Sequence, residues 1–377
     1  MASIFKWLLR LTGGAVLLAL TVVLGLYYLL SRSLPDYDAR LTARGLSAPL
    51  EIVRDHANVP HIFGQGDADT FFGLGYAHAQ DRLWQMVVLR RTAQGRLSEV
   101  FGPRTLEIDK VMRRFDLDDL ARSSVAAQTP QATLALRAYA AGVNARLAEI
   151  NAEALGRGAP EMFLFNAPMA PWQPADSLAI LKLMAVQLSS HLEHEVLRAR
   201  TSLALEDAAR IDDILPLAPG SGLAALPDYA SLVPGADTLR QAALAQPPRH
   251  PLSPFKPRAF AGASNAWAAA PARSATSGTL LANDPHLGFS APAIWYLARL
   301  ELQRGGVIGA TIPGMPLVMS GRSHDLGWGL TSSYLDDQDV HIERLNPENP
   351  GEYLTPEVSK PFRTAPPLPR TKDAESV

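Results

Sequence analysis

The sequence predicts an α+β protein in which a largely helical first part precedes a second part built of strands. Residues 130–149 and 174–200 carry apolar side chains at helical spacing. After Ser264, two short apolar segments flank a turn-like stretch at residues 274–278, which is the pattern of two paired strands, and we expect both strands to be buried. In front of both parts, residues 11–30 form an unbroken uncharged run that predicts one transmembrane helix.

The apolar N-terminal segment is predicted to be an uncleaved membrane anchor. It is about as long as the roughly 20 apolar residues that span a bilayer, and no clear Ala-x-Ala cleavage site follows it. Lys6 and Arg10 precede it, which places the N-terminus inside a bacterial-type cytoplasmic membrane and the globular part in the periplasm or outside. We assign residues 1–31 to the anchor and 32–47 to a tether. Two alternatives stay open: a cleaved signal segment that leaves a periplasmic protein, and a buried core helix.

The composition is that of an ordinary globular protein and excludes some classes of function. Of the 377 residues, 47% are hydrophobic and 19% charged, with a formal net charge of −2. The chain therefore lacks the basic excess of a nucleic-acid binder, and we expect no nucleic-acid partner. It contains no cysteine, which excludes disulfides but leaves the compartment open.

Residues 48–201 are predicted to be mostly helical. After a short strand at the start of this region, Asp67 or Asp69 could cap the next helix. That helix carries an apolar set that we expect in the core: Phe72, Tyr76, Leu83, Trp84 and Val87. His78 and Asp81 lie on the same helix. We expect them to make structural hydrogen bonds rather than to act in catalysis, because buried polar groups need partners.

The tripeptide Gly262-Ala263-Ser264 is a candidate site of self-cleavage. A serine hydroxyl is a weak nucleophile and needs a base beside it. Cleavage before Ser264 would give that residue a free α-amine, whose reference pKa of about 7.7–8.0 suits a base at neutral pH. Small residues before the serine fit a strained scissile bond. A plain small-residue loop that leads into a strand would have the same pattern.

Motifs on both sides of Ser264 resemble a single known family. Upstream stand Glu51-Ile-Val-Arg-Asp-His-Ala-Asn-Val-Pro-His-Ile62, Phe72-Gly-Leu-Gly-Tyr-Ala-His-Ala-Gln-Asp-Arg-Leu-Trp-Gln-Met86 and Gly95-Arg-Leu-Ser-Glu99. Downstream stand Leu280-Leu-Ala-Asn-Asp-Pro-His-Leu287, Gly327-Trp-Gly-Leu-Thr-Ser-Ser333 and Asp336-Asp-Gln-Asp339. In this order they resemble the smaller and larger chains of the penicillin acylase family, whose members are N-terminal-nucleophile amidohydrolases. The resemblance covers most of residues 48–350 and implies the αββα sandwich of those hydrolases.

The resemblance implies roles for three residues at the catalytic centre. Ser264 would be the nucleophile, and the backbone N–H of Ser332 would donate to the oxyanion. His286 matches the family position whose main chain helps to hold the nucleophile, although the best-known member has glutamine there. His286 could instead be the base of an ordinary serine triad on the strand next to Ser264, but the sequence shows no obvious third carboxylate for it.

Two further sets of residues are implied to bind ligands. An apolar pocket for the acyl group would be lined by Met184, Leu188 and Leu287, although core packing is an equal alternative for the first two. A structural Ca²⁺ would be held by Glu195, Asp336, the main-chain carbonyl of Gln338, and Asp339, since calcium prefers oxygen ligands. The acidic run could equally be a solvated turn, and Glu193 could take the place of Glu195. No organic cofactor is implied.

The resemblance also divides the chain. Residues 48–201 would form the small chain and 264–377 the start of the large chain, the two being partners after processing. Between them, residues 202–263 are dominated by alanine, proline and glycine, and we expect an extended or mobile stretch. In the family a spacer is excised here, although a plain linker would have the same composition. Family precursors are longer, and the asparagine of the oxyanion hole and a nearby arginine have no counterpart here, so the chain is expected to be truncated and weakly active or inactive.

The residues and the resemblance together leave three functions to be tested. The first is a membrane-tethered hydrolase of linear amides, acting on β-lactam side chains, N-acyl amino acids or N-acyl homoserine lactones. The second is a non-catalytic, membrane-anchored remnant that binds a ligand or partner through the same pocket. The third is a membrane-anchored serine hydrolase of triad type, which would need the His286 side chain.

Overall fold

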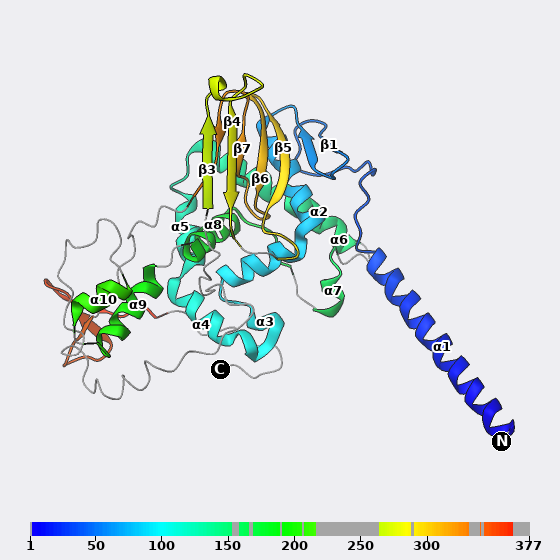
Figure 1. Ribbon diagram of the computed structural model, residues 1–377, viewed down its shortest axis with the longest axis horizontal. Helices are drawn as coiled ribbons and strands as arrows, with labels where there is room; N and C mark the ends of the chain where they lie inside the picture. Colours follow the sequence, from blue (N-terminus) through cyan, green and yellow to red (C-terminus); the bar gives the residue numbers. More distant parts are fainter. Residues whose placement is uncertain are drawn as a thin grey trace.

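Helices dominate the first part of the chain and strands the second, which confirms the predicted α+β class (Figure 1). The computed structural model describes residues 2–152, 158–165, 169–188, 191–205, 207–215, 264–287, 290–331, 340 and 343–364.

The elements follow one another along the chain with two strands ahead of the globular helices. The helices are α1 (Ala2–Ser31), α2 (Asp67–Ala93), α3 (Ser98–Phe101), α4 (Leu106–Phe115), α5 (Leu117–Val125), α6 (Pro130–Ala152), α7 (Glu161–Leu164), α8 (Pro174–Leu188), α9 (His191–Ser202) and α10 (Ala208–Ile214), with 3₁₀ turns η1 (Gly102–Thr105) and η2 (Pro271–Arg273). The strands are β1 (Glu51–Arg54), β2 (Pro60–Phe63), β3 (Ser264–Ala269), β4 (Leu280–Pro285), β5 (Tyr296–Leu302), β6 (Gly305–Thr311), β7 (Val318–Arg322), β8 (Gly327–Trp328), β9 (Arg344–Leu345), β10 (Glu352–Leu354) and β11 (Ser359–Pro361).

The N-terminal helix α1 projects away from the rest of the molecule (Figure 1). It has a mean hydropathy of 2.1, and none of its residues is buried. The alternative of a buried core helix is therefore wrong. By length and composition α1 can cross a membrane, and a signal sequence would have the same properties.

The segment between α1 and β1 contacts the globular part. The hydroxyl of Tyr37 donates to Asp81 Oδ1 at 3.0 Å, and its ring lies 3.9 Å from the guanidinium carbon of Arg54. A cavity of about 140 Å³ lies under this segment, with a lining that includes Leu41, Leu46, Leu50, Ile52 and Phe72. Tyr37 therefore contacts both β1 and α2, and apolar side chains of this segment line the cavity together with residues of those elements.

A six-stranded sheet joins the two parts of the chain, in the order β1-β2-β5-β6-β7-β8. β2 runs parallel to β5, with Ile62 opposite Leu300, and the other neighbours are antiparallel. Parallel neighbours need a crossover connection, and here the connection includes the whole helical region. One sheet thus contains strands from before and after Ser264.

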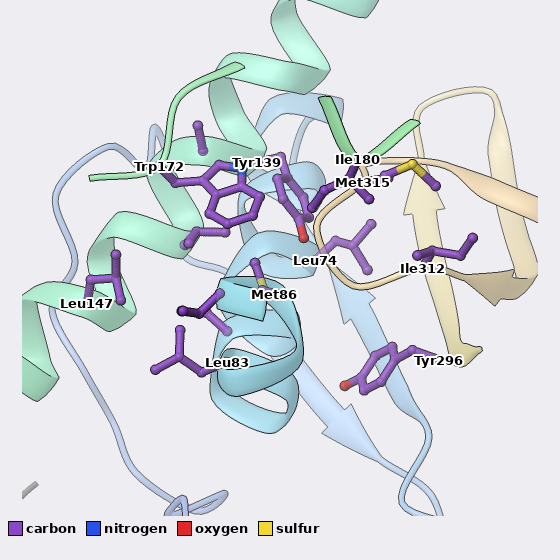
Figure 2. Close-up of a cluster of buried hydrophobic side chains, with 14 of the residues drawn as sticks. Leu74, Leu83, Met86, Tyr139, Leu147, Trp172, Ile180, Tyr296, Ile312 and Met315 are labelled. Carbon is purple, nitrogen blue, oxygen red and sulfur yellow. The ribbon is translucent and has the colours of Figure 1, made fainter. Parts of the chain in front are cut away.

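The main core lies where α2 and α6 meet this sheet (Figure 2). Its fully buried members include Ile62, Leu74, Met86, Tyr139, Leu300 and Ile312. Two glycines allow the helices to approach closely: a Cβ on Gly75 would lie 2.1 Å from the carbonyl oxygen of Tyr139, and one on Gly142 would lie 1.9 Å from that of Phe72. The four-layer sandwich implied by the resemblance stays a prediction.

Helix α2 begins without the predicted aspartate cap. Its N-cap residue is Gly66, and no side chain caps it. The carboxylate of Asp67 instead accepts the N–H of Gln303 at 2.8 Å. Asp69 accepts the N–H and hydroxyl of Ser47 at 2.8 and 2.6 Å. The capping prediction was wrong because both carboxylates bind segments that are distant in sequence.

The predicted strand near residue 50 and the helix over residues 130–149 are confirmed as β1 and α6. The predicted helix over 174–200 is described as two helices, α8 and α9, and residues 189–190 lie outside the described residues. The spacer was predicted to be extended, but its start contains α10, where the Asp207 carboxylate accepts the N–H of Ala209 at 3.0 Å and caps the helix. Residues 216–263 lie outside the described part of the chain.

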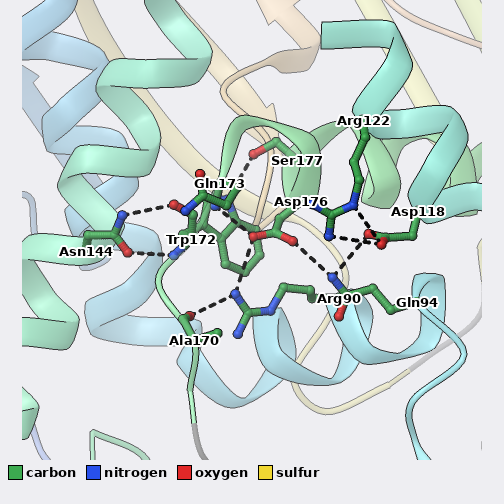
Figure 3. Close-up of polar contacts among 10 residues, drawn as sticks. All are labelled: Arg90, Gln94, Asp118, Arg122, Asn144, Ala170, Trp172, Gln173, Asp176 and Ser177. Carbon is green, nitrogen blue, oxygen red and sulfur yellow. Dashed lines mark hydrogen bonds and ion pairs between the residues drawn. The ribbon is translucent and has the colours of Figure 1, made fainter. Parts of the chain in front are cut away.

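Polar contacts around Asp176 fix α8 against α2 and α5 (Figure 3). Arg90 lies 3.4 Å from Asp176, and both side chains are buried. The Gln94 amide donates to Asp118 and to Asp176, each at 3.2 Å. Burial raises the pKa of Asp176, against the opposing effect of the Arg90 charge. The ring of Trp172 lies 5.0 Å from the Arg90 guanidinium carbon. This is a buried ion pair with a structural role.

Candidate active site

Ser264 is the first residue of β3, which pairs with β4 in an antiparallel hairpin. The register sets Ser264 opposite Pro285 and Ala269 opposite Leu280, which confirms the two predicted strands and their turn. The prediction that both strands are buried was wrong, because Trp267 is 68% and Leu281 41% exposed. The hairpin forms its own two-stranded sheet, and within the described residues no third strand pairs with it.

The register of the hairpin decides which side chains Ser264 can meet. Successive residues of a strand point to opposite faces, and directly paired residues share a face. Ser264 therefore shares a face with Pro285 and with Asn283, while Asn265 and its partner Asp284 lie on the other. Ser264 is half-buried at the start of its strand.

His286 has a carboxylate partner that the sequence analysis did not identify. Its Nε2 lies 2.7 Å from Asp284 Oδ2, and both side chains are exposed. The expectation of no obvious third carboxylate for His286 was therefore wrong. However, Asp284 lies on the face opposite to Ser264, and no hydrogen bond joins Ser264 to His286 within the described residues. The three residues are not arranged as a serine triad.

Asn283 connects this hairpin to the edge of the six-stranded sheet. Its Nδ2 donates to the carbonyl oxygens of Asn265 at 2.9 Å and Leu330 at 3.1 Å, and its Oδ1 accepts the N–H of Leu330 at 3.2 Å. The Gly-Trp-Gly motif permits this contact, since a Cβ on Gly329 would lie 2.7 Å from Asn283 Cβ. The contacts of Asn283 were not predicted from the sequence, although a polar residue in a strand expected to be buried needs partners.

The predicted acyl-pocket residues occupy different surroundings. Met184 is 4% exposed and lies in the main core, which is the core-packing alternative. Leu188, the last residue of α8, is 40% exposed, and Leu287, two residues after β4, is 38% exposed. A pocket formed by these side chains stays a prediction.

Most of the residues predicted to form the oxyanion hole and the calcium site lie outside the described residues, namely Ser332, Asp336, Gln338 and Asp339. Gly262 and Ala263, before the predicted cleavage site, also lie outside them. Glu195 is described and is partly buried in α9. Within the described residues, no group of three or more His, Cys, Asp or Glu side chains is placed to hold a metal ion. The roles of Ser332 and of the calcium ligands stay predictions.

A buried polar network links α2 and α6 to the strands after Ser264. His78 is fully buried, with Nδ1 2.8 Å from Tyr139 Oη and Nε2 2.9 Å from Thr311 Oγ1. Thr311 Oγ1 donates its proton to the carbonyl of Tyr296 at 2.6 Å. Nε2 of His78 must then carry the proton that Thr311 accepts, and Nδ1 accepts the proton of Tyr139. Burial lowers the pKa of His78 to about 3. The predicted structural role is confirmed.

Asp81 also makes structural contacts, as predicted. Arg54 lies 2.8 Å from its Oδ2, and the hydroxyl of Tyr296 donates to the same oxygen at 2.6 Å. Burial, with the nearby Asp81 charge, raises the pKa of Tyr296 well above its usual value. Residues of the first part of the chain thus bind β5 through a second polar contact.

Comparisons with known proteins agree with the motifs. The model of the penicillin amidase family matches residues 49–376. Penicillin acylase 2 proenzyme of Pseudomonas sp. (strain SE83) is 34% identical over 328 residues, which are 84% of this chain and 40% of that protein. Acyl-homoserine lactone acylase QuiP of Pseudomonas aeruginosa is 34% identical over 325 residues, which are 83% of this chain and 36% of that protein. Penicillin G acylase of Escherichia coli is 28% identical over 351 residues, 82% of this chain and 42% of that protein.

These comparisons also show how much of each relative the chain covers. It spans between 36% and 42% of the length of these three curated relatives. Among solved structures, a thermostable penicillin G acylase from Alcaligenes faecalis aligns with 48% of this chain and 97% of its own, at 27% identity and a TM-score of 0.40. Because the family model matches residues 49–376, well over half of the sequence, the chain belongs to the penicillin amidase family.

Proposed function

We propose that this chain carries the nucleophile of a linear-amide hydrolase, and that Ser264 acts through its own α-amine after cleavage of the preceding peptide bond. Family membership supports amide hydrolysis. The observation that supports this base is the hairpin register, which puts Asp284, the partner of His286, on the face opposite to Ser264. With that histidine engaged elsewhere, an α-amine at the start of β3 would be a base on the nucleophilic residue itself.

The proposed reaction proceeds through an acyl-enzyme. The Ser264 hydroxyl attacks the amide carbonyl carbon while the α-amine, through a bridging water, takes the hydroxyl proton. The tetrahedral intermediate collapses, the proton passes to the departing amine, and the acyl group stays on Ser264. Water then hydrolyses the ester and restores the hydroxyl. By resemblance the Ser332 N–H is one oxyanion donor, and loss of such a donor costs on the order of 10²- to 10³-fold in rate.

Cleavage would leave two polypeptides that stay together. β2 is flanked in the sheet by β1 and β5, so the sheet contains strands of both. The buried bond of His78 to Thr311 and the partly buried bond of Tyr296 to Asp81 would join the same two polypeptides. We therefore expect the small and large chains to copurify.

The proposed substrates are amides with an apolar acyl group. Relatives named penicillin acylase and acyl-homoserine lactone acylase support this class, and the exposed Leu188 and Leu287 are candidates for the acyl site. β-Lactam side-chain amides and N-acyl homoserine lactones are the two substrate families to compare. A panel that varies the acyl group and the amine separately would distinguish them.

Two further assignments belong to the proposal. The mean hydropathy of α1 and the absence of buried residues in it support a membrane anchor with the globular part outside the cytoplasm. The acidic composition of residues 336–339 supports a Ca²⁺ site shared with Glu195. Carbonate extraction of membranes tests the first assignment. For the second, a rise in melting temperature with added Ca²⁺ should be lost in Asp336→Ala and Glu195→Ala.

Intact-mass measurement of the expressed protein tests the main proposal. The expected result is a new polypeptide that begins at Ser264, absent in Ser264→Ala. Once cut, parallel His286→Ala and Asp284→Ala variants should still hydrolyse the amide substrate, since the proposed base of that reaction is the α-amine. Loss of amide hydrolysis in both the His286→Ala and the Asp284→Ala variant would favour the triad. A folded but uncut wild-type protein would favour the non-catalytic alternative.

A further inference from the structure

We infer that Asn283 is a positioning residue for the Ser264 nucleophile, an inference that rests on the proposed function. Its side-chain amide is the described connection between the strand that begins with Ser264 and the segment that follows β8. Asn265 directly follows Ser264, and Leu330 stands two residues before Ser332 in the sequence. One side chain thus holds the backbone next to Ser264 and the backbone two residues before Ser332.

The side-chain amide of Asn283 binds the backbone of Leu330 as a neighbouring strand would. A neighbouring strand offers one N–H and one C=O to the backbone beside it. The amide of Asn283 offers the same pair to Leu330, at 3.1 and 3.2 Å, and gives its second N–H to the carbonyl of Asn265 at 2.9 Å. Both N–H groups of the amide are therefore used.

This side chain matters because the two sheets share no described backbone pairing. β4 pairs with β3 in the two-stranded sheet, and β8 is the last strand of the six-stranded sheet, so their described contacts are made by side chains. Reaction rates are sensitive to such contacts, since a misplacement of the reacting groups by about 1 Å can lower the rate on the order of 10²-fold. A partly exposed amide can therefore control the rate of cleavage without controlling folding.

Two glycines make room for the contact between the β3–β4 hairpin and the segment around β8. A Cβ on Gly329 would lie 2.7 Å from Asn283 Cβ and 2.8 Å from its Cγ, and one on Gly327 would lie 2.9 Å from Leu281 Cδ2. Larger residues would push the segment away from the hairpin. Gly329→Ala, which changes the other side of the contact, should therefore have the same effect on cleavage as Asn283→Ala.

The first experiment measures cleavage before Ser264 in the full 377-residue chain by intact mass over time. Asn283→Ala and Gly329→Ala should each slow cleavage by about 10-fold or more, with an unchanged melting temperature. Asn346→Ala is the matched control, because that amide bridges Glu352 and Ser359 in a different sheet. Gly278→Ala controls for the glycine, since the nearest atom to its Cβ would be 3.6 Å away. Both controls should be cut at the wild-type rate.

The second measurement separates positioning from general stability. In the cleaved fraction, phenylmethanesulfonyl fluoride should sulfonylate Ser264 with a lower maximal rate in Asn283→Ala and an unchanged half-saturating concentration. Amide exchange followed by mass spectrometry should rise in peptides that cover Leu330 and not in those that cover β10.

The outcomes distinguish this inference from the proposed function. An uncut wild-type protein overturns the proposed function, and amide exchange at Leu330 still tests the contact between Asn283 and Leu330. Equal cleavage rates in wild type and Asn283→Ala, or unchanged exchange at Leu330, overturn the inference. A parallel fall in melting temperature and rate would also overturn it, because the effect would then be on folding.

Discussion

The helical core and the β3–β4 hairpin are built in opposite ways. In the core, the backbones of α2 and α6 approach closely at Gly75 and Gly142, and His78 and Arg90 are buried with polar partners. In the hairpin, Trp267 and Leu281 are exposed, and Asn283 attaches the strands to the larger sheet. The comparison teaches that the stability of this protein and its proposed chemistry reside in different regions. Changes to the core should alter folding, and changes to the hairpin should alter cleavage.

The largest expected effect comes from breaking the buried ion pair. Arg90→Met leaves Asp176 buried without its cation, and removal of one partner from such a pair costs about 3–5 kcal/mol. The midpoint of urea unfolding at pH 7 measures the loss. The double variant Arg90→Met/Asp176→Leu should recover most of it. Arg122→Met, in a more exposed pair with Asp118, is the control and should cost about 0–1 kcal/mol. Equal losses in the two single variants would contradict the assignment of Arg90.

The next effect tests the close approach of α2 and α6. In Gly142→Ala the new Cβ would lie 1.9 Å from the Phe72 carbonyl oxygen, so the backbones must separate. Overpacking of this kind costs about 1–3 kcal/mol. Thermal unfolding should show a lower melting temperature for Gly142→Ala than for Gly278→Ala, which adds the same methyl group to the hairpin turn. A tolerated Gly142→Ala would mean that the helices are not in tight contact.

Acid should destabilise the core through His78. The unfolded chain binds a proton at this histidine below about pH 6.5, whereas burial lowers the pKa of the folded protein to about 3. Stability is therefore fully present above pH 6.5 and falls as the pH decreases towards 3. Relative to His78→Gln, the wild type should lose about 2 kcal/mol between pH 7 and pH 5. Urea titrations at both pH values measure this difference, and an equal loss in the two proteins would show that His78 is not buried in its neutral form.

The smallest effect is expected in the hairpin. Trp267 is 68% exposed, so Trp267→Ser should change the free energy of unfolding by no more than about 0.5 kcal/mol. Leu74→Ala, at a fully buried core position, should cost about 2–5 kcal/mol under the same conditions. If Trp267→Ser were destabilising by more than about 1 kcal/mol, this face of the hairpin would have to be covered.

The sequence predicted elements whose apolar pattern reflects local burial. The spacing of α6 and the alternation around the turn after β3 depend on neighbouring residues, so both were visible without the fold. The aspartate cap of α2 failed for the opposite reason. Asp67 binds Gln303, and no local pattern can reveal a partner in the second part of the chain.

The candidate site was predicted in part. The position of Ser264 at the start of a strand followed from the residues, as did the neighbouring strand that leads to His286. The carboxylate partner of His286 was also accessible, because Asp284 stands two residues before it and strand alternation places such residues on one face. The role of Asn283 was not accessible, since it depends on the distant Leu330.

The parallel pairing of β2 with β5 also has a consequence for the order of events during synthesis. Thr70, at the start of α2, donates to the carbonyl of Glu301, 231 residues later in the chain. The edge of β2 that pairs with β5 therefore stays unpaired until β5 has been made. Long-range pairing of this kind folds slowly and leaves intermediates open to aggregation. A nascent chain that pauses before β5 should depend on chaperones far more than one that pauses after β7.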